Sequence, residues 1–161
     1  MFNGHPTYGT RPGYDRKTQA ENRARQLYQD VSSQARWRQV WSVLTRRLRR
    51  LHDLETTQAN CTVLNHRYSG KQIVPISQIR GSGSSGRSGD FDADFRPLSD
   101  RTRRRWLSVA TAWQSGIKLP PVDLIQIGET YFVEDGHHRI SVAQAFGRTE
   151  IEAKVTVLEV A

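Results

Sequence analysis

The sequence lacks the defining features of two large classes of protein. It has a single cysteine, Cys61, so it cannot form an internal disulfide. No run of apolar residues approaches the length that a helix needs to cross a bilayer. The first residues also lack the basic and then apolar pattern of a secretion signal. These absences exclude a disulfide-stapled scaffold and predict a protein of the reducing cytoplasm with no membrane partner.

Apolar residues are scarce, and acids are scarce in one half of the chain. Hydrophobic residues make up 36% of the 161 residues, so we expect one domain with a modest core plus a solvated accessory segment. The net charge is +8. Residues 1–80 carry 14 Lys and Arg against 5 Asp and Glu, whereas residues 81–161 carry 10 against 11. The basic half indicates either a polyanionic partner such as nucleic acid or a solvated helix face.

The first third of the chain predicts an arm and a helix. Residues 1–14 are rich in Gly, Pro, Tyr and Asn and are typical of a flexible arm, whereas residues 15–55 form a basic, amphipathic helical segment or a helical hairpin. Its apolar stripe needs a partner, and we favour the C-terminal domain over a second copy of the chain in a homodimer. The stripe comprises Leu27, Val31, Trp37, Trp41, Leu44, Leu48 and Leu51.

The rest of the chain predicts an α+β domain over residues 72–161. Residues 55–71 are polar and are typical of a linker, and residues 80–98 form a long Gly/Ser/Asp loop. Pro75 places the first strand at a sheet edge. The predicted elements are a strand at Gln72–Ile76, a helix from Ser99 or Asp100 to Ser115, strands at Val122–Ile127 and Thr130–Val133, a helix at His138–Phe146 and a strand at Ile151–Val160.

The segment Asp135-Gly136-His137-His138-Arg139 predicts an anion site. A strand meets a tight turn here and a helix follows, so first-turn N–H groups lie beside two imidazoles and a guanidinium. We expect Gly136, His137, His138 and Arg139 to hold phosphate, with His137 as a candidate catalytic base. One histidine should face the site while the other packs. Adjacent histidines cannot share one metal with the geometry of a zinc helix, and no cysteine cluster supports zinc.

The run Gly81–Ser88 imitates a phosphate-binding P-loop, with Arg87 in the place of lysine. The residues that follow it do not open a helix, so we reject a P-loop. A Gly/Ser loop with one arginine can still fold over a phosphate, because its backbone N–H groups are able to turn inward. We therefore keep Arg87 as a candidate phosphate ligand on a lid.

Asp90, Asp92 and Asp94 alternate with Phe91 and Phe95. The spacing resembles the start of a calcium loop, but the sixth and twelfth positions are wrong, which excludes an EF-hand. In an extended segment the three carboxylates would share one face. Asp90 and Asp92 are then candidates for a Mg²⁺ site or for a general base. The alternative is a loop of solvated acids whose two phenylalanines anchor it in the core.

Two groups of arginines predict contacts with phosphate. A basic first turn at residues 101–105 opposes the helix dipole, so its arginines are candidates to bind an anion or to pair with the aspartates of residues 90–94. The second group lies at residues 46–50. The candidate nucleic-acid ligands are Arg46, Arg47, Arg49, Arg50, Arg103 and Arg104.

Residues 72–160, which include the Asp-Gly-His-His-Arg turn, resemble the ParB/sulfiredoxin superfamily. The resemblance includes the opening strand, the Asp-Phe-Asp loop, Gly116 before the Pro-Pro strand, and the helix that ends in Phe146-Gly147. Sulfiredoxins carry a nucleophilic cysteine in this turn where the present chain has His137, so sulfiredoxin chemistry is excluded. The two histidines look most like the free-serine-kinase branch.

The resemblance implies two functions, and the arginine-rich segments indicate a third. The first is a nucleotide-binding domain for ATP, ADP or CTP with Mg²⁺, acting as a switch or a weak NTPase. The second is a small-molecule phosphotransferase that uses a loop aspartate as base. The third is a DNA-binding protein that acts through its arginine-rich helices. In the first two, residues 136–139 would bind the phosphates.

Overall fold

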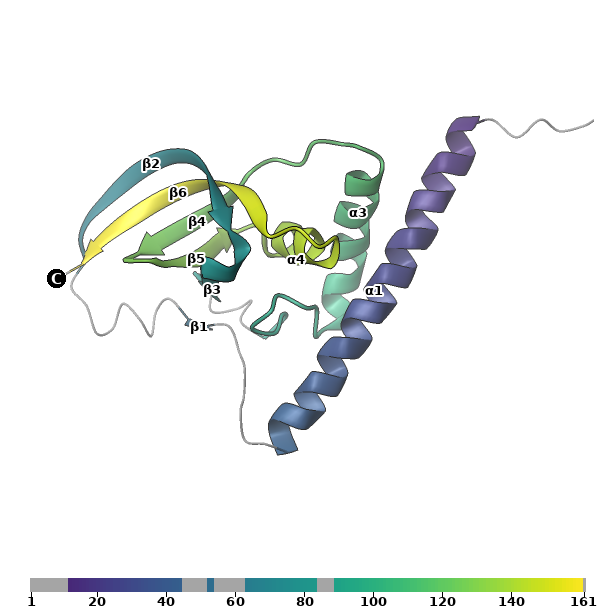
Figure 1. Cartoon of the computed structure of the whole chain (residues 1–161), viewed down its shortest axis with the longest axis horizontal. Helices are drawn as coiled ribbons and strands as arrows, with labels where there is room; N and C mark the ends of the chain where they lie inside the picture. Colours follow the sequence, from purple (N-terminus) through teal and green to yellow (C-terminus); the bar gives the residue numbers. More distant parts are fainter. Residues whose placement is uncertain (1–11, 45–51, 54–62, 84–88, 161) are drawn as a thin grey trace, which may run out of the picture.

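The computed structural model has the predicted α+β fold, a mixed sheet preceded by an N-terminal helix (Figure 1), and it describes residues 12–44, 52–53, 63–83 and 89–160. The described sheet has the strand order β1-β3-β5-β4-β6-β2. In chain order the elements are α1 (Pro12–Leu44), β1 (His52–Asp53), β2 (Val63–Pro75), η1 (Ile76–Gln78), β3 (Ile79–Ser82), η3 (Asp100–Thr102), α3 (Arg103–Gln114), β4 (Val122–Ile127), β5 (Thr130–Asp135), α4 (His137–Ala145) and β6 (Glu150–Val160).

The described sheet combines three parallel pairings with two antiparallel pairings. Strand β4 lies between β5, which is antiparallel to it, and β6, which is parallel. Strand β3 is parallel to β5, and the long strands β2 and β6 pair in antiparallel register along most of their length. Strand β2 ends at Pro75 and lies at an edge of the sheet, which confirms the edge position predicted from that proline.

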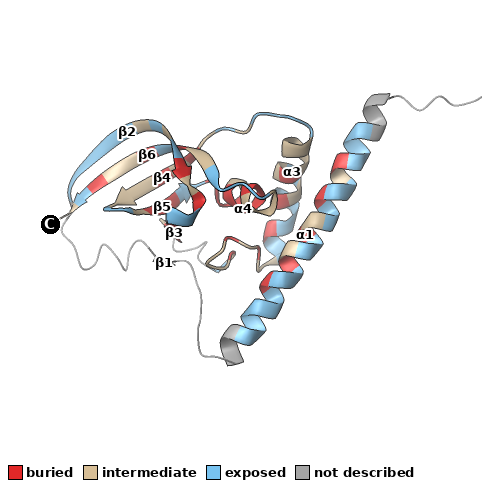
Figure 2. Cartoon of the chain, viewed as in Figure 1, coloured by how far each residue is buried: buried red, intermediate tan, exposed pale blue. Residues whose placement is uncertain are grey.

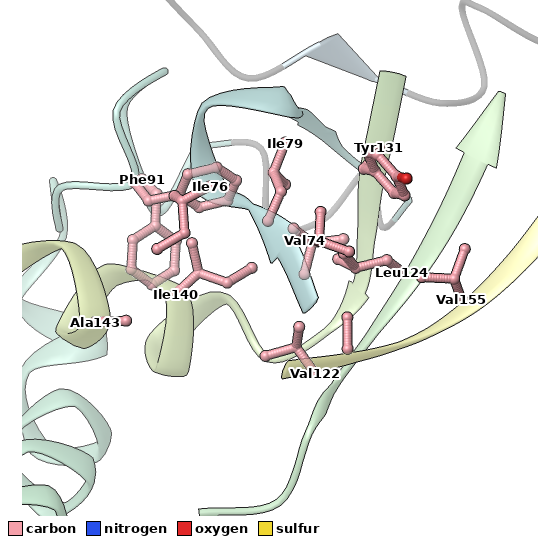
Figure 3. Packing of buried hydrophobic residues seen from close by; sticks show 13 residues of the cluster. Val74, Ile76, Ile79, Phe91, Val122, Leu124, Tyr131, Ile140, Ala143 and Val155 are labelled. Atoms are coloured by element: carbon pink, nitrogen blue, oxygen red, sulfur yellow. The ribbon is translucent and has the colours of Figure 1, made fainter. Parts of the chain in front are cut away.

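The main core lies between the sheet and α4 (Figure 3). Side chains of β2, β4 and β5 such as Val74, Leu124 and Val133 pack against Ile140 and Ala143 of α4. All of these residues are almost fully buried. The start of α4 is therefore held against the carboxyl end of β5, and this contact positions the Asp-Gly-His-His-Arg turn.

Helix α4 also contributes to a second core on its other side. Val142 packs with Trp106 and Ala110 of α3 and with Ala24 and Tyr28 of α1. The Trp106 indole N–H donates a buried hydrogen bond of 2.8 Å to the Ser141 hydroxyl. Helix α4 is thus enclosed between the sheet and α3, and α1 covers the outer side of α3 (Figure 1).

Helix α1 docks on the domain, as expected, but through only part of the predicted stripe: Leu27 packs against the second core, whereas Leu48 and Leu51 lie outside the described residues. Its buried residues are small or slender and recur every three or four positions (Figure 2): Ala20, Ala24, Tyr28, Ser32 and Ala35. Trp37 and Trp41 are 69% and 62% exposed, so the tryptophan-based prediction of the buried face is wrong. These mostly small side chains are buried in place of the tryptophans because they let the backbones of α1 and α3 approach closely.

Three further boundaries differ from the prediction. Residues 63–71 are not linker, because β2 begins at Val63 and pairs with β6 through backbone hydrogen bonds that its polar side chains do not reveal. Residues 80–82 of the predicted loop belong instead to strand β3, a short Ile-Arg-Gly-Ser segment in which Arg80 alone is exposed and which has little apolar pattern. Helix α1 begins at Pro12, inside the predicted arm, with the proline at a helix start where its missing N–H does no harm.

No helix within the described residues is long and apolar enough to cross a membrane.

The docking of α1 predicts that a charge in the α1–α3 contact will detach the helix. Ala24→Asp buries a carboxylate against Trp106 and Ala110, at a cost of about 2–4 kcal/mol. We expect trypsin to cleave faster within α1. Gln26→Asp, an exposed position two residues later, should leave the cleavage rate unchanged. Equal cleavage of the two variants would contradict the docking.

Candidate functional site

The start of α4 depends on a glycine at position 136. Gly136 has a φ of 113°, which L side chains rarely adopt, and it precedes the first residue of the helix. A Cβ atom there would lie 2.5 Å from Cγ1 of Val122 and 2.8 Å from its Cβ. The first α-helical hydrogen bond runs from the Ile140 N–H to the Gly136 carbonyl. The turn is therefore tight and pressed onto β4.

A cleft of about 240 Å³ opens at this helix start. Two cations line it, Arg105 from α3 and Arg139 from α4, and Asp135 is the one acid in its lining. The positive end of the α4 dipole also faces this region. The remaining lining residues are Val109, Leu119, Pro120, Gly136, His137 and His138. The cleft thus combines positive charge with a partly apolar wall.

Arg139 has a structural task as well as a place in the cleft. Its Nη1 donates to the carbonyl oxygens of Pro120 (2.9 Å) and Pro121 (2.5 Å). Its Nη2 donates to Asp135 at 2.6 Å. The side chain is only 13% exposed. Arg139 therefore ties the segment before β4 to the end of β5, and only part of its guanidinium remains for a ligand.

His137 is a core residue. Its side chain is fully buried, its Nε2 lies 2.9 Å from the Ser82 hydroxyl on β3, and its ring stacks on Phe91 at a centroid distance of 5.9 Å. Its Nε2 atom is already engaged with a hydroxyl of the core, which indicates a structural role for the ring. The predicted role of His137 as a catalytic base therefore finds no support in its placement.

His138 lies at the cleft. It is 9% exposed and meets Phe91 edge-on at 5.2 Å. Both adjacent histidines contribute to the lining of the cleft, but the His137 ring is fully buried against Phe91 and Ser82, whereas His138 keeps some exposure. Phe91 contacts both histidine rings. It belongs to the acidic loop, residues 90–96, so this loop supports the start of α4 from the core side.

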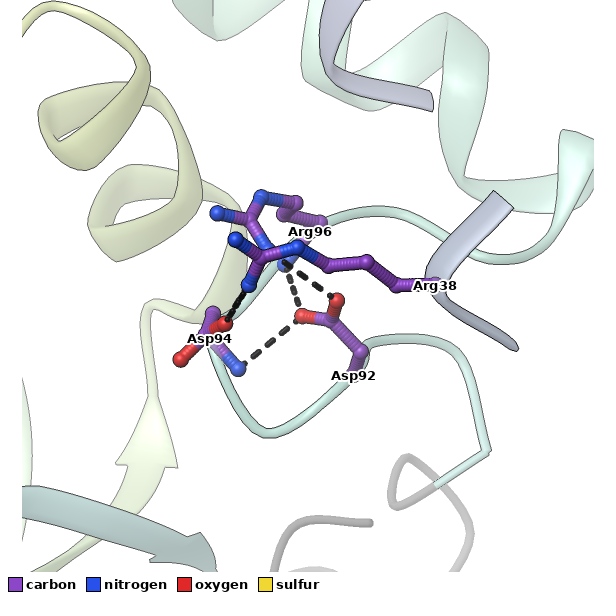
Figure 4. Close-up of polar contacts among 4 residues, drawn as sticks. All are labelled: Arg38, Asp92, Asp94 and Arg96. Atoms are coloured by element: carbon purple, nitrogen blue, oxygen red, sulfur yellow. Dashed lines mark hydrogen bonds and ion pairs between the residues drawn. The ribbon is translucent and has the colours of Figure 1, made fainter. Parts of the chain in front are cut away.

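The acidic loop is a compact turn rather than an extended segment, so the predicted shared face of three carboxylates is wrong. Asp92 accepts hydrogen bonds from the backbone N–H groups of Asp94 (2.9 Å) and Arg96 (2.7 Å), and Asp94 pairs with Arg38 and Arg96 (Figure 4). Phe91 and Phe95 are buried and anchor the loop, as the alternative reading proposed.

Burial raises the pKa of the Asp92 carboxyl above its ordinary value of 3.8, while its hydrogen bond from the Arg96 N–H and the Arg96 charge oppose the rise. Asp90 pairs with Arg101 at 2.7 Å. Neither Asp90 nor Asp92 lines the cleft. Within the described ranges, no group of three or more His, Cys, Asp or Glu is placed to hold a metal. The catalytic and metal roles suggested for these two aspartates therefore remain predictions.

The remaining arginines fall into three groups. Arg46, Arg47, Arg49, Arg50 and Arg87 lie outside the described residues. Arg103 lies over the Tyr28 ring at 5.9 Å, which joins α3 to α1. Arg104 points to a different groove, on the other flank of α3. The predicted nucleic-acid arginines thus do not form a single described cluster.

Arg105 belongs to the basic turn at residues 101–105 that the sequence offered as an anion site, whereas sequence reasoning did not single out Arg38. The helical period gives the signal for Arg105: with Trp106 and Ala110 buried, Arg105 and Val109 follow each other along the flank that faces α4. No such signal exists for Arg38. Its 2.8 Å pair with Asp94 joins residues 56 positions apart.

The glycine at the turn yields a matched pair of substitutions. Gly136→Ala adds a methyl group into Val122 at a strained φ, so we expect it to lower the free energy of unfolding by about 3 kcal/mol or more. Gly128→Ala has a positive φ but open space around it, and should cost about 1 kcal/mol. Urea unfolding of both variants checks the difference, and equal losses would refute the packing argument.

From the environment of Asp92 we predict how the stability of the protein depends on this hydrogen-bond acceptor and on pH. Asp92→Ala leaves two backbone N–H groups without their acceptor and should cost about 1–3 kcal/mol, whereas Asp92→Asn keeps an oxygen acceptor and should cost less. Because folding raises this pKa, the associated stability is fully present below the ordinary pKa and is lost as the pH rises through the folded-state value.

The stability of Asp92→Asn relative to the wild type should therefore rise with pH across this window. Urea unfolding between about pH 3 and 7 measures it. A constant difference between the two proteins would show that the carboxyl is not shifted.

Comparisons with known proteins give one structural match. No family model matches the sequence, and no curated protein matches it significantly. The crystal structure of sulfiredoxin from Arabidopsis thaliana aligns with 53% of this chain and 82% of its own, at 22% identity and a TM-score of 0.35. At this identity and TM-score the match says nothing about ligand or activity, and the branch stays a prediction.

Proposed function

We propose that the cleft at the start of α4 binds the phosphate groups of a nucleotide. The observation that carries the proposal is the convergence of Arg105, His138 and Arg139 on a hollow at the positive end of α4. Guanidinium and imidazole groups donate charge-assisted hydrogen bonds to phosphate oxygens. Asp135 pairs with Arg139 at 2.6 Å and offsets its charge, so Arg105 supplies most of the net positive charge of the cleft.

The volume of the cleft fits phosphates better than a whole nucleotide. At about 240 Å³ it is smaller than most small-molecule pockets. A second hollow of about 400 Å³ shares Leu119, Pro120 and Arg139 with it, so the two adjoin at these residues. The second hollow offers Trp113 and Ile151, together with Arg148 at 5.9 Å from the Trp113 ring. It gives room for the base and sugar.

The site supports binding more than turnover. The acids that could serve as a base or a Mg²⁺ ligand, Asp90 and Asp92, are paired or hydrogen-bonded away from the cleft. We therefore favour a nucleotide-dependent switch, with Mg²⁺ arriving on the nucleotide. Phosphotransferase activity and duplex DNA binding stay as predictions, because no observation at this site favours either.

Adjacent arginines on α3 supply the test. Arg105→Gln should weaken nucleotide binding about tenfold or more, because it removes a charged donor from the cleft. Arg104→Gln removes the same charge one residue away, on the flank that faces another groove, and should leave affinity within about twofold. Calorimetry against ATP, ADP, CTP and GTP, with and without Mg²⁺, measures both.

Arg139→Ala is a poorer probe, because its loss also releases the Pro120 and Pro121 carbonyls and destabilises the fold. Unfolding curves must show that the Arg105 variant is as stable as the wild type. If no nucleotide binds the wild type, or if both arginine variants lose affinity equally, the assignment of this cleft fails.

A further inference from the structure

A larger basic groove lies on the other flank of α3, between α3 and the first half of α1. Its volume is about 1040 Å³. Four cations of α1 line it: Arg16, Lys17, Arg23 and Arg25. Glu21 is the one acid in its lining. The wall from α1 therefore presents a surplus of positive charge to whatever enters.

The wall from α3 adds a polar stripe. Arg104, Ser108, Thr111 and Ser115 line the groove at spacings of four, three and four, so they follow one face of the helix and its C-terminal cap. A row of hydroxyls between guanidinium groups is the donor set that proteins use for phosphate and sugar contacts. The groove therefore suits a chain of phosphates better than a single anion.

Helix α1 carries exposed aromatic side chains beyond the groove. Trp37 lies 14 residues after Arg23, close to four helical turns, so the two side chains point to similar sides of α1 at a separation of about 21 Å along its axis. Trp37 is 69% exposed. A chain that leaves the groove along this side of α1 would therefore meet an indole face.

We propose that this groove binds single-stranded nucleic acid, with the phosphates between α1 and α3 and a base stacked on Trp37. Cations that track a backbone next to an aromatic platform are the usual means of sequence-tolerant single-strand binding. An acidic peptide would use the cations but would gain little from the hydroxyl stripe or the indole.

This site is separate from the nucleotide cleft. Arg104 lines the groove and Arg105 lines the cleft, so the two neighbours face opposite flanks of α3. Loss of nucleotide binding in Arg105→Gln should leave single-strand binding unchanged. The two proposals therefore succeed or fail independently.

Fluorescence anisotropy of the full chain with an oligothymidylate of about 15 nucleotides tests the groove. The double variant Arg23→Gln/Arg104→Gln should bind at least about tenfold more weakly at low salt, and its slope of log K against log salt should fall by about 1.4. The control is Lys71→Gln/Arg80→Gln, which removes two exposed cations from β2 and β3 and should change neither value.

Trp37→Ala tests the aromatic platform. It should weaken binding about fivefold or more without changing the salt slope, because stacking releases no counterions. Tyr68→Ala, a 63% exposed aromatic on β2, is the matched control and should bind like the wild type.

Three results would overturn the proposal. One is equal weakening by the groove and control double variants, and another is tighter binding of duplex than of single-stranded DNA. The third is competition by polyglutamate at the same charge concentration as effectively as by the oligonucleotide, which would mean that the groove responds to charge alone.

Discussion

The structure depends on the burial of α4 on both of its sides. Ile140 and Ala143 pack into the core of the sheet, while Val142 packs against Trp106 and Ala110 of α3. A nine-residue helix is too short to be stable alone, so its position is set entirely by these two contacts. The sheet fixes the turn before α4, and α4 in turn fixes α3, on which α1 rests.

This burial explains why the motif divides into structural and ligand-facing parts. His137 belongs to the core through Ser82 and Phe91, and Arg139 ties the Pro120-Pro121 carbonyls to Asp135. Of the basic groups of the motif, His138 and part of Arg139 keep some exposure at the cleft. The residues that the sequence predicted to be functional thus mostly stabilise the turn. Much of the positive charge at the cleft comes from α3.

Helix α3 separates the cations of the domain into two regions. Because Trp106 and Ala110 must be buried, the residues on either side of them are directed to opposite flanks. Arg105 is placed beside the start of α4, and Arg104 is placed beside α1. The docking of α1 then surrounds one flank with further arginines, so a single packing contact creates both the small cleft and the long groove.

The sequence by itself determined the α+β class, the helices of the domain, its central strands and the turn at Gly136, because these depend on local period and on turn residues. It missed β3 and most of β2, whose partners are β5 and β6, because strand pairing is made by backbone groups and leaves little trace in side chains. Only the tertiary structure decided that Ala24 rather than Trp37 is buried, that His137 packs inward and that Arg38 reaches Asp94. Each of these depends on the shape or charge of a surface distant in sequence, which no local pattern encodes.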